Sequence, residues 1–232
     1  MKQIKQILSA LLGFAFCVAG NSCQNNYELE NAVSTASAIR TNLSSRSTDA
    51  MPFFKGADLS YTNELEDCGV QFKENGVVKD AYTLMNSYGA NLIRLRLWHN
   101  PTWTNYSTLS DVKKSIKRAK ALNMYVLLDF HYSDTWTDPE QNVVPAAWAS
   151  VVDDTPTLAD SVYNYTIATL KNLRSENLLP NMVQIGNETN KNIMVADNSL
   201  LEPVDYARNV QLFNAGLKAI SDFNEMYGTN IK

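Results

Sequence analysis

Apolar runs that suit β-strands alternate along this chain with segments whose apolar residues recur at helical spacing. The runs cover residues 53–59, 91–98, 124–131 and 182–188, and residues 91–98 alternate between apolar and polar side chains as a strand does. Helical spacing follows each run, at residues 77–88, 110–122, 157–178 and 206–220. Strands and helices that alternate in this way predict parallel β–α–β units.

Residues at the ends of these segments predict where the helices begin and end. Ser110 is a natural N-cap for the helix at 110–122, because its hydroxyl can accept a bond from a free backbone N–H of the first turn. Gly89 and Gly228 are expected to end the helices before them, since glycine readily takes the left-handed conformation.

The strand ends decide between an open sheet and a closed barrel. No glycine-rich phosphate loop follows the first strand. Polar or aromatic residues instead occupy the C-terminal end of every strand, namely Asp58, Arg96, Trp98, His131, Asn187 and Glu188. Because the active site of a (β/α)8 TIM barrel lies at that end, the pattern predicts this α/β fold. A full barrel needs about 250 residues, so residues 51–232 are expected to form its N-terminal half, with a fifth strand starting near residue 230.

The N-terminus predicts export rather than structure. Lys2 and Lys5 precede an apolar run, and small residues then lead to Cys23, which is typical of a signal peptide over residues 1–23. We favour a lipoprotein signal with Cys23 as the lipidated residue over ordinary secretion with cleavage near Gly20. Residues 24–50 are rich in Ser, Thr and Asn and predict a flexible tether. The protein is therefore expected in the periplasm or on the outer-membrane surface, with the lipid anchor as its contact with the membrane.

Composition excludes several other classes of protein. The net charge is −4, and no cluster of basic residues lies beyond the extreme N-terminus, so nucleic-acid binding is disfavoured. Cys68 would be the single cysteine of the folded part, which rules out a disulfide within it. The chain holds two histidines, too few for a zinc site of the Cys/His type, although oxygen ligands for a metal stay open.

Side-chain parity predicts a polar interior at the second and third strands. Arg94, Arg96 and Trp98 should face the barrel interior while their apolar neighbours face the helices, and Asp129 and His131 should also point inward. Buried charges need partners. These are expected to be the carboxylates and hydroxyls of a polar site. Asp129 and one of the arginines are expected to form an internal ion pair that supports the fold.

Glu188 is the candidate catalytic acid. Glycoside cleavage needs a carboxylic acid to protonate the departing oxygen and a second carboxylate across the bond. An Asn-Glu pair alone is more often a surface turn, but its place at the end of the fourth strand makes it informative. The long connection from His131 to about residue 157 suggests a binding loop, with Tyr132, Asp134, Trp136, Asp138 and Trp148 as its candidates. Trp148 could equally be a small core that holds the loop down.

Four motifs in order extend this interpretation. They are FKGADLS at 54–60, RLRLW at 94–98, DFHYSDTWTDP at 129–139 and VQIGNE at 183–188. Together they resemble the arabinogalactan endo-β-1,4-galactanases of glycoside hydrolase family 53. The resemblance implies a retaining barrel enzyme that cuts β-1,4-galactan in pectic side chains, with Glu188 as acid/base and Asn187 on the sugar 2-hydroxyl. It places Asp58, Arg94, Arg96, Trp98, His131, Asp134 and Trp136 at the substrate cleft.

The resemblance also bears on what this chain lacks. It puts the nucleophilic Glu at the end of a seventh strand, beyond Lys232, and implies no cofactor in this chain, with calcium only through later loops. The full-length protein is expected to be a monomer. Two alternatives stay open: another retaining barrel glycosidase, such as a mannanase or xylanase, and a non-catalytic glycan-binding lipoprotein.

Overall fold

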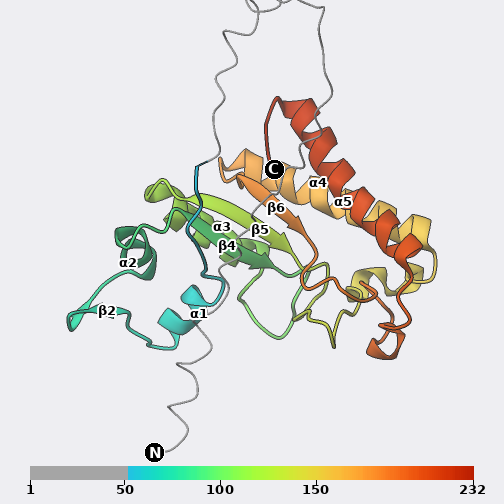
Figure 1. Ribbon diagram of the computed structural model, residues 1–232, viewed down its shortest axis with the longest axis horizontal. Coiled ribbons are helices and arrows are strands. Elements are labelled where there is room, and N and C mark those ends of the chain that lie inside the picture. The colour runs from blue at the N-terminus through green and yellow to red at the C-terminus, as the bar shows by residue number, and fades with distance from the viewer. Residues whose placement is uncertain (1–51) are drawn as a thin grey trace, which may run out of the picture. The chain divides into compact units, whose positions relative to one another are not determined.

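The computed structural model describes residues 52–232, which form a parallel sheet with helices packed on it (Figure 1). The strands are β1 (Gly56–Asp58), β4 (Leu92–Leu97), β5 (Tyr125–Phe130) and β6 (Met182–Ile185). They are hydrogen-bonded in that order and all run parallel. The strands of this sheet are thus arranged in the order in which they occur along the chain, as in the wall of a barrel. The predicted signal peptide, Cys23 and tether lie outside the described residues.

The large helices begin and end at identifiable capping residues. They are α3 (Leu109–Ala121), α4 (Thr155–Ser175) and α5 (Tyr206–Tyr227). The predicted cap of α3 was wrong: the Thr108 side chain accepts from the Asp111 N–H, and Ser110 already lies inside the helix. Gly228 ends α5 with a φ of 62°, which confirms its predicted role.

The segment before β4 differs from its predicted helix at 77–88. Val77–Val78 form a short strand, β3, which pairs antiparallel with β2 (Lys73–Glu74). The helix α2 (Ala81–Ser87) starts only after Asp80, whose carboxylate accepts from the Thr83 N–H. Asn75 and Gly76 both have positive φ and close a tight turn, which favours a hairpin over a helix here. A further short helix, α1 (Thr62–Asp67), was not predicted.

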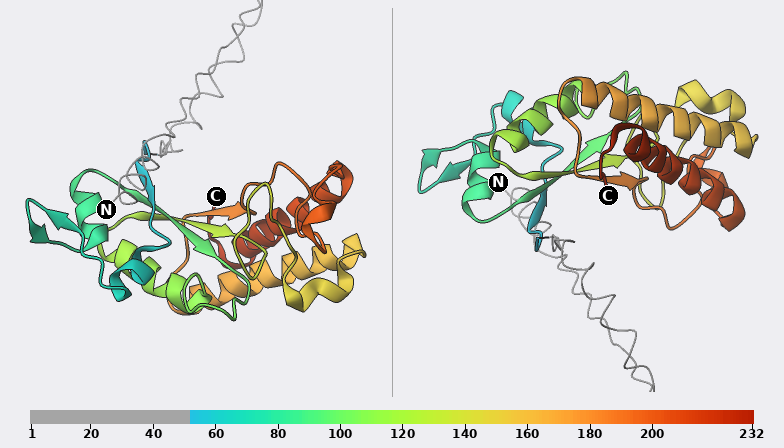
Figure 2. Two further views of the ribbon diagram at one scale, coloured as in Figure 1. Left: turned by 90° about the horizontal axis from the view of Figure 1, so that it is seen from below. Right: turned by 90° about the horizontal axis from the view of Figure 1, so that it is seen from above.

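One face of the sheet carries the hydrophobic core. Ile93, Leu95 and Leu97 of β4 are almost fully buried and pack with Val126 and Leu128 of β5. Helices α3, α4 and α5 cover this face (Figure 2). The opposite parity carries Arg94, Arg96 and Asp129, so the predicted division of β4 and β5 into a helix-facing set and an interior set is confirmed.

Two short 3-10 turns lie in the loops that follow β5 and β6. Ala146–Val151 form a 3-10 turn (η2), and Asn198–Leu200 form another (η3). At the far edge, Lys232 donates its N–H to the Asn181 carbonyl and accepts from the Val183 N–H, at 3.0 and 2.7 Å. This is the bonding pattern of a parallel neighbour of β6 and agrees with the predicted strand at residue 230. Among residues 52–232, no helix is both long and apolar enough to cross a membrane.

Candidate active site

Arg94 is the centre of a polar network at the C-terminal end of the sheet. The register of the strands places Asp58 opposite Arg94, and Asp129 opposite Gln184. The guanidinium of Arg94 donates to Asp58 at 2.6 Å, to Asp129 at 2.5 Å, to the Asn187 side chain at 2.6 Å and to Gln184 at 3.2 Å. One arginine therefore joins all four strands, and the anticipated ion pair with Asp129 is confirmed.

Asn187 is held rigidly by this network. It is buried, its Oδ1 accepts from Arg94, and its Nδ2 donates to the Thr137 carbonyl at 2.7 Å. An amide oxygen has two lone pairs and an amide nitrogen two hydrogens, so each atom keeps one bonding position free. Asn187 can therefore still bind a hydroxyl without leaving its place.

Glu188 lies beyond the strand rather than at its end. Strand β6 stops at Ile185, because Gly186 turns the backbone with a φ of 82°. A larger residue does not fit at this position, since its Cβ would lie 2.7 Å from the Thr189 methyl. Glu188 itself has a φ of 47°, a conformation that costs a non-glycine residue on the order of 1–3 kcal/mol. Its side chain is exposed and has no hydrogen-bond partner among the described residues. The bend thus presents a free carboxylate directly after a fixed amide.

His131 and its aromatic neighbours form the next part of the site. The Trp98 indole N–H lies 3.3 Å from His131 Nδ1, and Thr137 Oγ1 lies 2.9 Å from the same nitrogen. Because an indole N–H can only donate, Nδ1 accepts, and the neutral ring carries its proton on Nε2. This Nε2 is 3.0 Å from Asp129 Oδ2, though not aligned for a hydrogen bond. Trp136 packs against the ring with centroids 5.8 Å apart.

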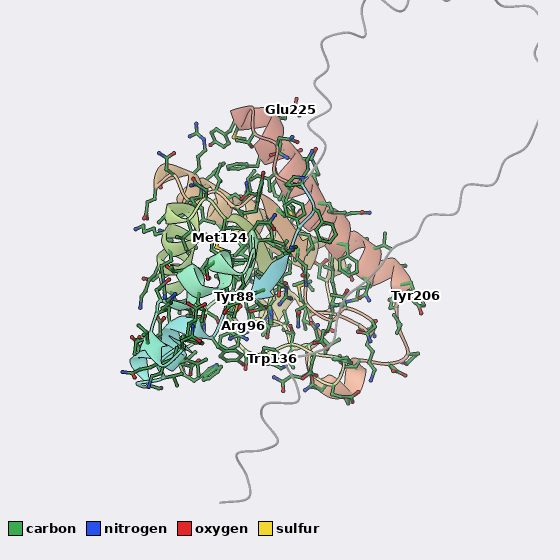
Figure 3. All side chains as sticks on the ribbon, turned by 60° about the vertical axis from the view of Figure 1, so that its left-hand side comes forward. Tyr88, Arg96, Met124, Trp136, Tyr206 and Glu225 are labelled. Carbon is green, nitrogen blue, oxygen red and sulfur yellow. The ribbon has the colours of Figure 1, made fainter. Side chains whose placement is uncertain are left out.

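Arg96 is buried without a carboxylate partner among residues 52–232. Its Nε donates to the Ser107 hydroxyl at 3.0 Å, and its guanidinium lies 4.3 to 5.0 Å from the ring centres of three aromatic residues, Tyr61, Trp98 and Trp136. Cation–π attraction therefore takes the place of the expected carboxylate. Figure 3 shows Arg96 and Trp136 close to each other.

Asp134 fastens two loops of the site to each other. Its Oδ1 accepts from the Asn100 N–H at 2.8 Å, and its Oδ2 accepts from the Ala146 N–H at 2.9 Å. The His99 ring lies 3.4 Å from the same carboxylate, yet burial lowers the pKa of His99 more than Asp134 raises it. With its oxygens engaged by backbone, Asp134 is positioned to hold loops, and contact with a sugar stays a prediction.

Two aromatic candidates of the long loop, Trp148 and Tyr132, belong to the core. Trp148 is buried against His99 and Tyr165, with centroids 4.8 and 5.8 Å apart, so it is part of the core. Tyr132 also belongs to the core, and its hydroxyl bonds Thr166 at 2.8 Å. Burial raises the pKa of both Tyr132 and Tyr165. Neither tyrosine is available for stacking on a ligand, in contrast to the prediction for Tyr132.

The structure therefore gathers most of the predicted residues at one end of the sheet. These are Asp58, Arg94, Arg96, Trp98, His131, Trp136, Asn187 and, next to them in sequence, Glu188. The sequence prediction missed Tyr61, Ser107 and Gln184. Gln184 could have been found by parity, since it is a polar residue inside an apolar strand, whereas Tyr61 and Ser107 lie in segments without a periodic pattern. Within residues 52–232, no cluster of three or more His, Cys, Asp or Glu side chains could hold a metal ion.

Comparison with known sequences identifies the kind of protein that this chain resembles. The model of glycosyl hydrolase family 53 matches residues 54–232. An arabinogalactan endo-β-1,4-galactanase of Cellvibrio japonicus is 49% identical over 185 residues, which cover 79% of this chain and 49% of that protein. An endo-β-1,4-galactanase of Bacillus subtilis is 37% identical over 74% of this chain and 40% of its own length. The chain thus spans about half the length of the curated relatives it matches.

Solved structures agree with the sequence comparison. The GH53 catalytic domain of Ignisphaera aggregans superposes with a TM-score of 0.66 at 34% identity, covering 79% of this chain and 51% of that one. A structure of fungal β-1,4-galactanases superposes with a TM-score of 0.67 at 30% identity, covering 73% and 49%. These likenesses confirm the predicted (β/α)8-barrel class for residues 52–232.

Proposed function

Because this chain belongs to glycosyl hydrolase family 53, we propose that the full-length protein hydrolyses β-1,4-galactosidic linkages inside galactan chains. The galactanase names of its relatives support the substrate. The observation that carries the proposal is the pair Asn187 and Glu188, a fixed amide followed by a free carboxylate at the end of the sheet where barrel enzymes act.

In the proposed mechanism Glu188 acts twice. It first protonates the departing glycosidic oxygen while a second carboxylate attacks the anomeric carbon, and it then deprotonates the water that releases the sugar. The second carboxylate is expected beyond Lys232, and none of the residues described above is given its role. Asn187 uses its free bonding positions for the 2-hydroxyl, and its bond to Arg94 keeps it in place.

The other residues of the site are proposed to bind and orient the sugar. Trp136, which is 36% exposed, offers a ring face for stacking, and the buried side chains of His131 and Arg96 are proposed to position that ring. The Asp58 side chain is 41% exposed, so its carboxylate can accept a hydrogen bond from a sugar hydroxyl while it stays paired with Arg94. Asp129 is fully buried and is proposed to orient Arg94 rather than to touch substrate.

The test is the isosteric variant Glu188→Gln in the full-length protein, assayed by release of reducing ends from linear galactan. Turnover should fall by about 10²-fold or more, since general acid–base catalysis contributes on that scale. Substrate binding and the thermal midpoint should stay near the wild-type values. Near-normal turnover would falsify the assignment of Glu188.

Mannan and xylan distinguish the proposed substrate from those of other retaining barrel enzymes. Hydrolysis of these two polymers without hydrolysis of galactan would contradict the substrate assignment while leaving Glu188 in place. Binding of galactan without any hydrolysis would instead favour the glycan-binding alternative. Activity after treatment with EDTA tests whether the full-length protein uses calcium bound by later loops.

We also propose that the protein is exported and lipidated at Cys23. The support is the sequence of residues 1–23, with basic, apolar and small-residue segments in order before the cysteine. Metabolic labelling with a fatty acid should mark the wild type and not Cys23→Ala. Labelling of both proteins, or of neither, would contradict lipidation at this residue.

A further inference from the structure

Trp103 is a large exposed aromatic residue that the proposed function does not use. Its side chain is 62% exposed, compared with 36% for Trp136 and less than a tenth for Trp98 and Trp148. Single exposed apolar residues are ordinary on protein surfaces. The rigidity of Trp103 and its position therefore decide whether its exposure has a use.

The Trp103 ring is held in place although it faces solvent. Its indole N–H donates to the Asp134 carbonyl at 3.2 Å, and its ring packs on Trp98 with centroids 5.0 Å apart. The loop beneath it is fixed by the bonds from Asn100 to the Asp134 carboxylate and from the His99 N–H to the Ser133 carbonyl. A ring that is already immobile loses little conformational entropy when a ligand stacks on it.

Trp103 is also continuous with the candidate active site. Trp98, on which it packs, contacts the Arg96 guanidinium at 4.4 Å and donates to His131. The half-exposed Tyr61 flanks the same guanidinium. Trp103 is therefore the most exposed member of an aromatic group around Arg96, at the sheet end that holds Glu188.

We propose that Trp103 is an outlying subsite that stacks on one hexopyranose ring of a polysaccharide chain, away from the bond that is cleaved. This inference rests on the proposed function and extends its site. The C–H face of a pyranose ring is flat and apolar and matches an indole face, and a polymer bound at Glu188 has further rings to place. Thr102 and Thr104 beside Trp103 are polar, which suits hydroxyl-bearing sugars better than an apolar protein surface.

The experiment compares Trp103→Ala with the control Tyr88→Ala in the full-length protein. Tyr88 is 72% exposed and follows α2, which leads into the start of β4, so it lies at the opposite end of the sheet. Trp103→Ala should raise KM for polymeric galactan about three- to tenfold, the loss of one aromatic contact. It should leave kcat on the polymer and kcat/KM on a chromogenic galactobioside unchanged. Trp103→Phe keeps an aromatic ring and should raise KM for the polymer less than Trp103→Ala does. Tyr88→Ala should have the wild-type KM.

Three results would overturn the inference. They are an unchanged KM for the polymer, an equal loss on polymer and galactobioside, and the same change in Tyr88→Ala.

Binding measured in the Glu188→Gln background separates this inference from the proposed function. Galactan, mannan and xylan are each cast into native gels, and the migration of Glu188→Gln is compared with that of Glu188→Gln/Trp103→Ala. Suppose that galactan fails as substrate while another glycan retards Glu188→Gln. Weaker retardation of Glu188→Gln/Trp103→Ala by that glycan would then support the subsite. Retardation that does not depend on Trp103, or none by any of the three glycans, overturns it.

Discussion

Arg94 allows the energetics of this site to be tested with a single side chain. Its guanidinium binds two carboxylates that differ in burial: Asp129 is 0% exposed, whereas Asp58 is 41% exposed. Truncation in Arg94→Met removes the cation and leaves the Asp129 carboxylate buried without its charged partner. Breaking a buried pair in this way costs about 3–5 kcal/mol. We expect the lower end of that range, because Arg94 keeps 28% of its side-chain surface in contact with solvent.

The matched control neutralises the exposed partner. Asp58→Asn leaves an oxygen that can still accept from Arg94, and the lost charge is solvated, so the expected loss is below about 1 kcal/mol. The double variant Arg94→Met/Asp129→Asn should be more stable than Arg94→Met alone, because the uncompensated charge has been removed together with its partner.

Urea unfolding of the full-length protein, followed by intrinsic fluorescence, measures all of these variants. Equal losses in Arg94→Met and Asp58→Asn would refute the argument, since burial would then make no difference to the cost of losing a partner. A double variant less stable than Arg94→Met would refute it as well.

Three further results are expected. Gly216→Ala should destabilise the protein by about 1–3 kcal/mol in urea unfolding, because the new Cβ would lie 2.8 Å from the Ile185 side chain, and a stabilised variant would contradict this contact. Thr108→Ala should cost about 1 kcal/mol and Ser110→Ala only a few tenths, because Thr108 caps α3, so equal losses would argue against that cap. His99 should titrate in NMR below its ordinary pKa of about 6.5. Since its folded pKa is lowered, its contribution to stability is present above pH 6.5 and lost as the pH falls, and His99→Asn should reduce this loss.

Much of the fold could be predicted because its signals are local. The alternation of residues 91–98 fixed which side chains of β4 face the helices, and the same parity placed Arg94, Asp129 and His131 on the polar side. Errors arose where a local signal was ambiguous. Val77 and Val78 fit a helical pattern as well as a strand, and the turn at Asn75 and Gly76 decided between them. Ser110 and Thr108 are both good caps, and their order in the chain does not say which one lies outside the helix.

The sequence by itself determined the order of the main parallel strands and their large helices, most residues of the site, and the pair Asn187 and Glu188 as its candidate for chemistry. The tertiary structure decided how the charges are partnered. Arg94 and Arg96 stand two residues apart on one strand, yet Arg94 binds two carboxylates and Arg96 is enclosed by aromatic rings. This difference depends on the register of neighbouring strands and on loops far away in the chain, and no periodicity within β4 encodes either. The exposure of Trp103 was decided in the same way, because Asp134, which follows another strand, accepts the bonds that hold the Trp103 loop in place.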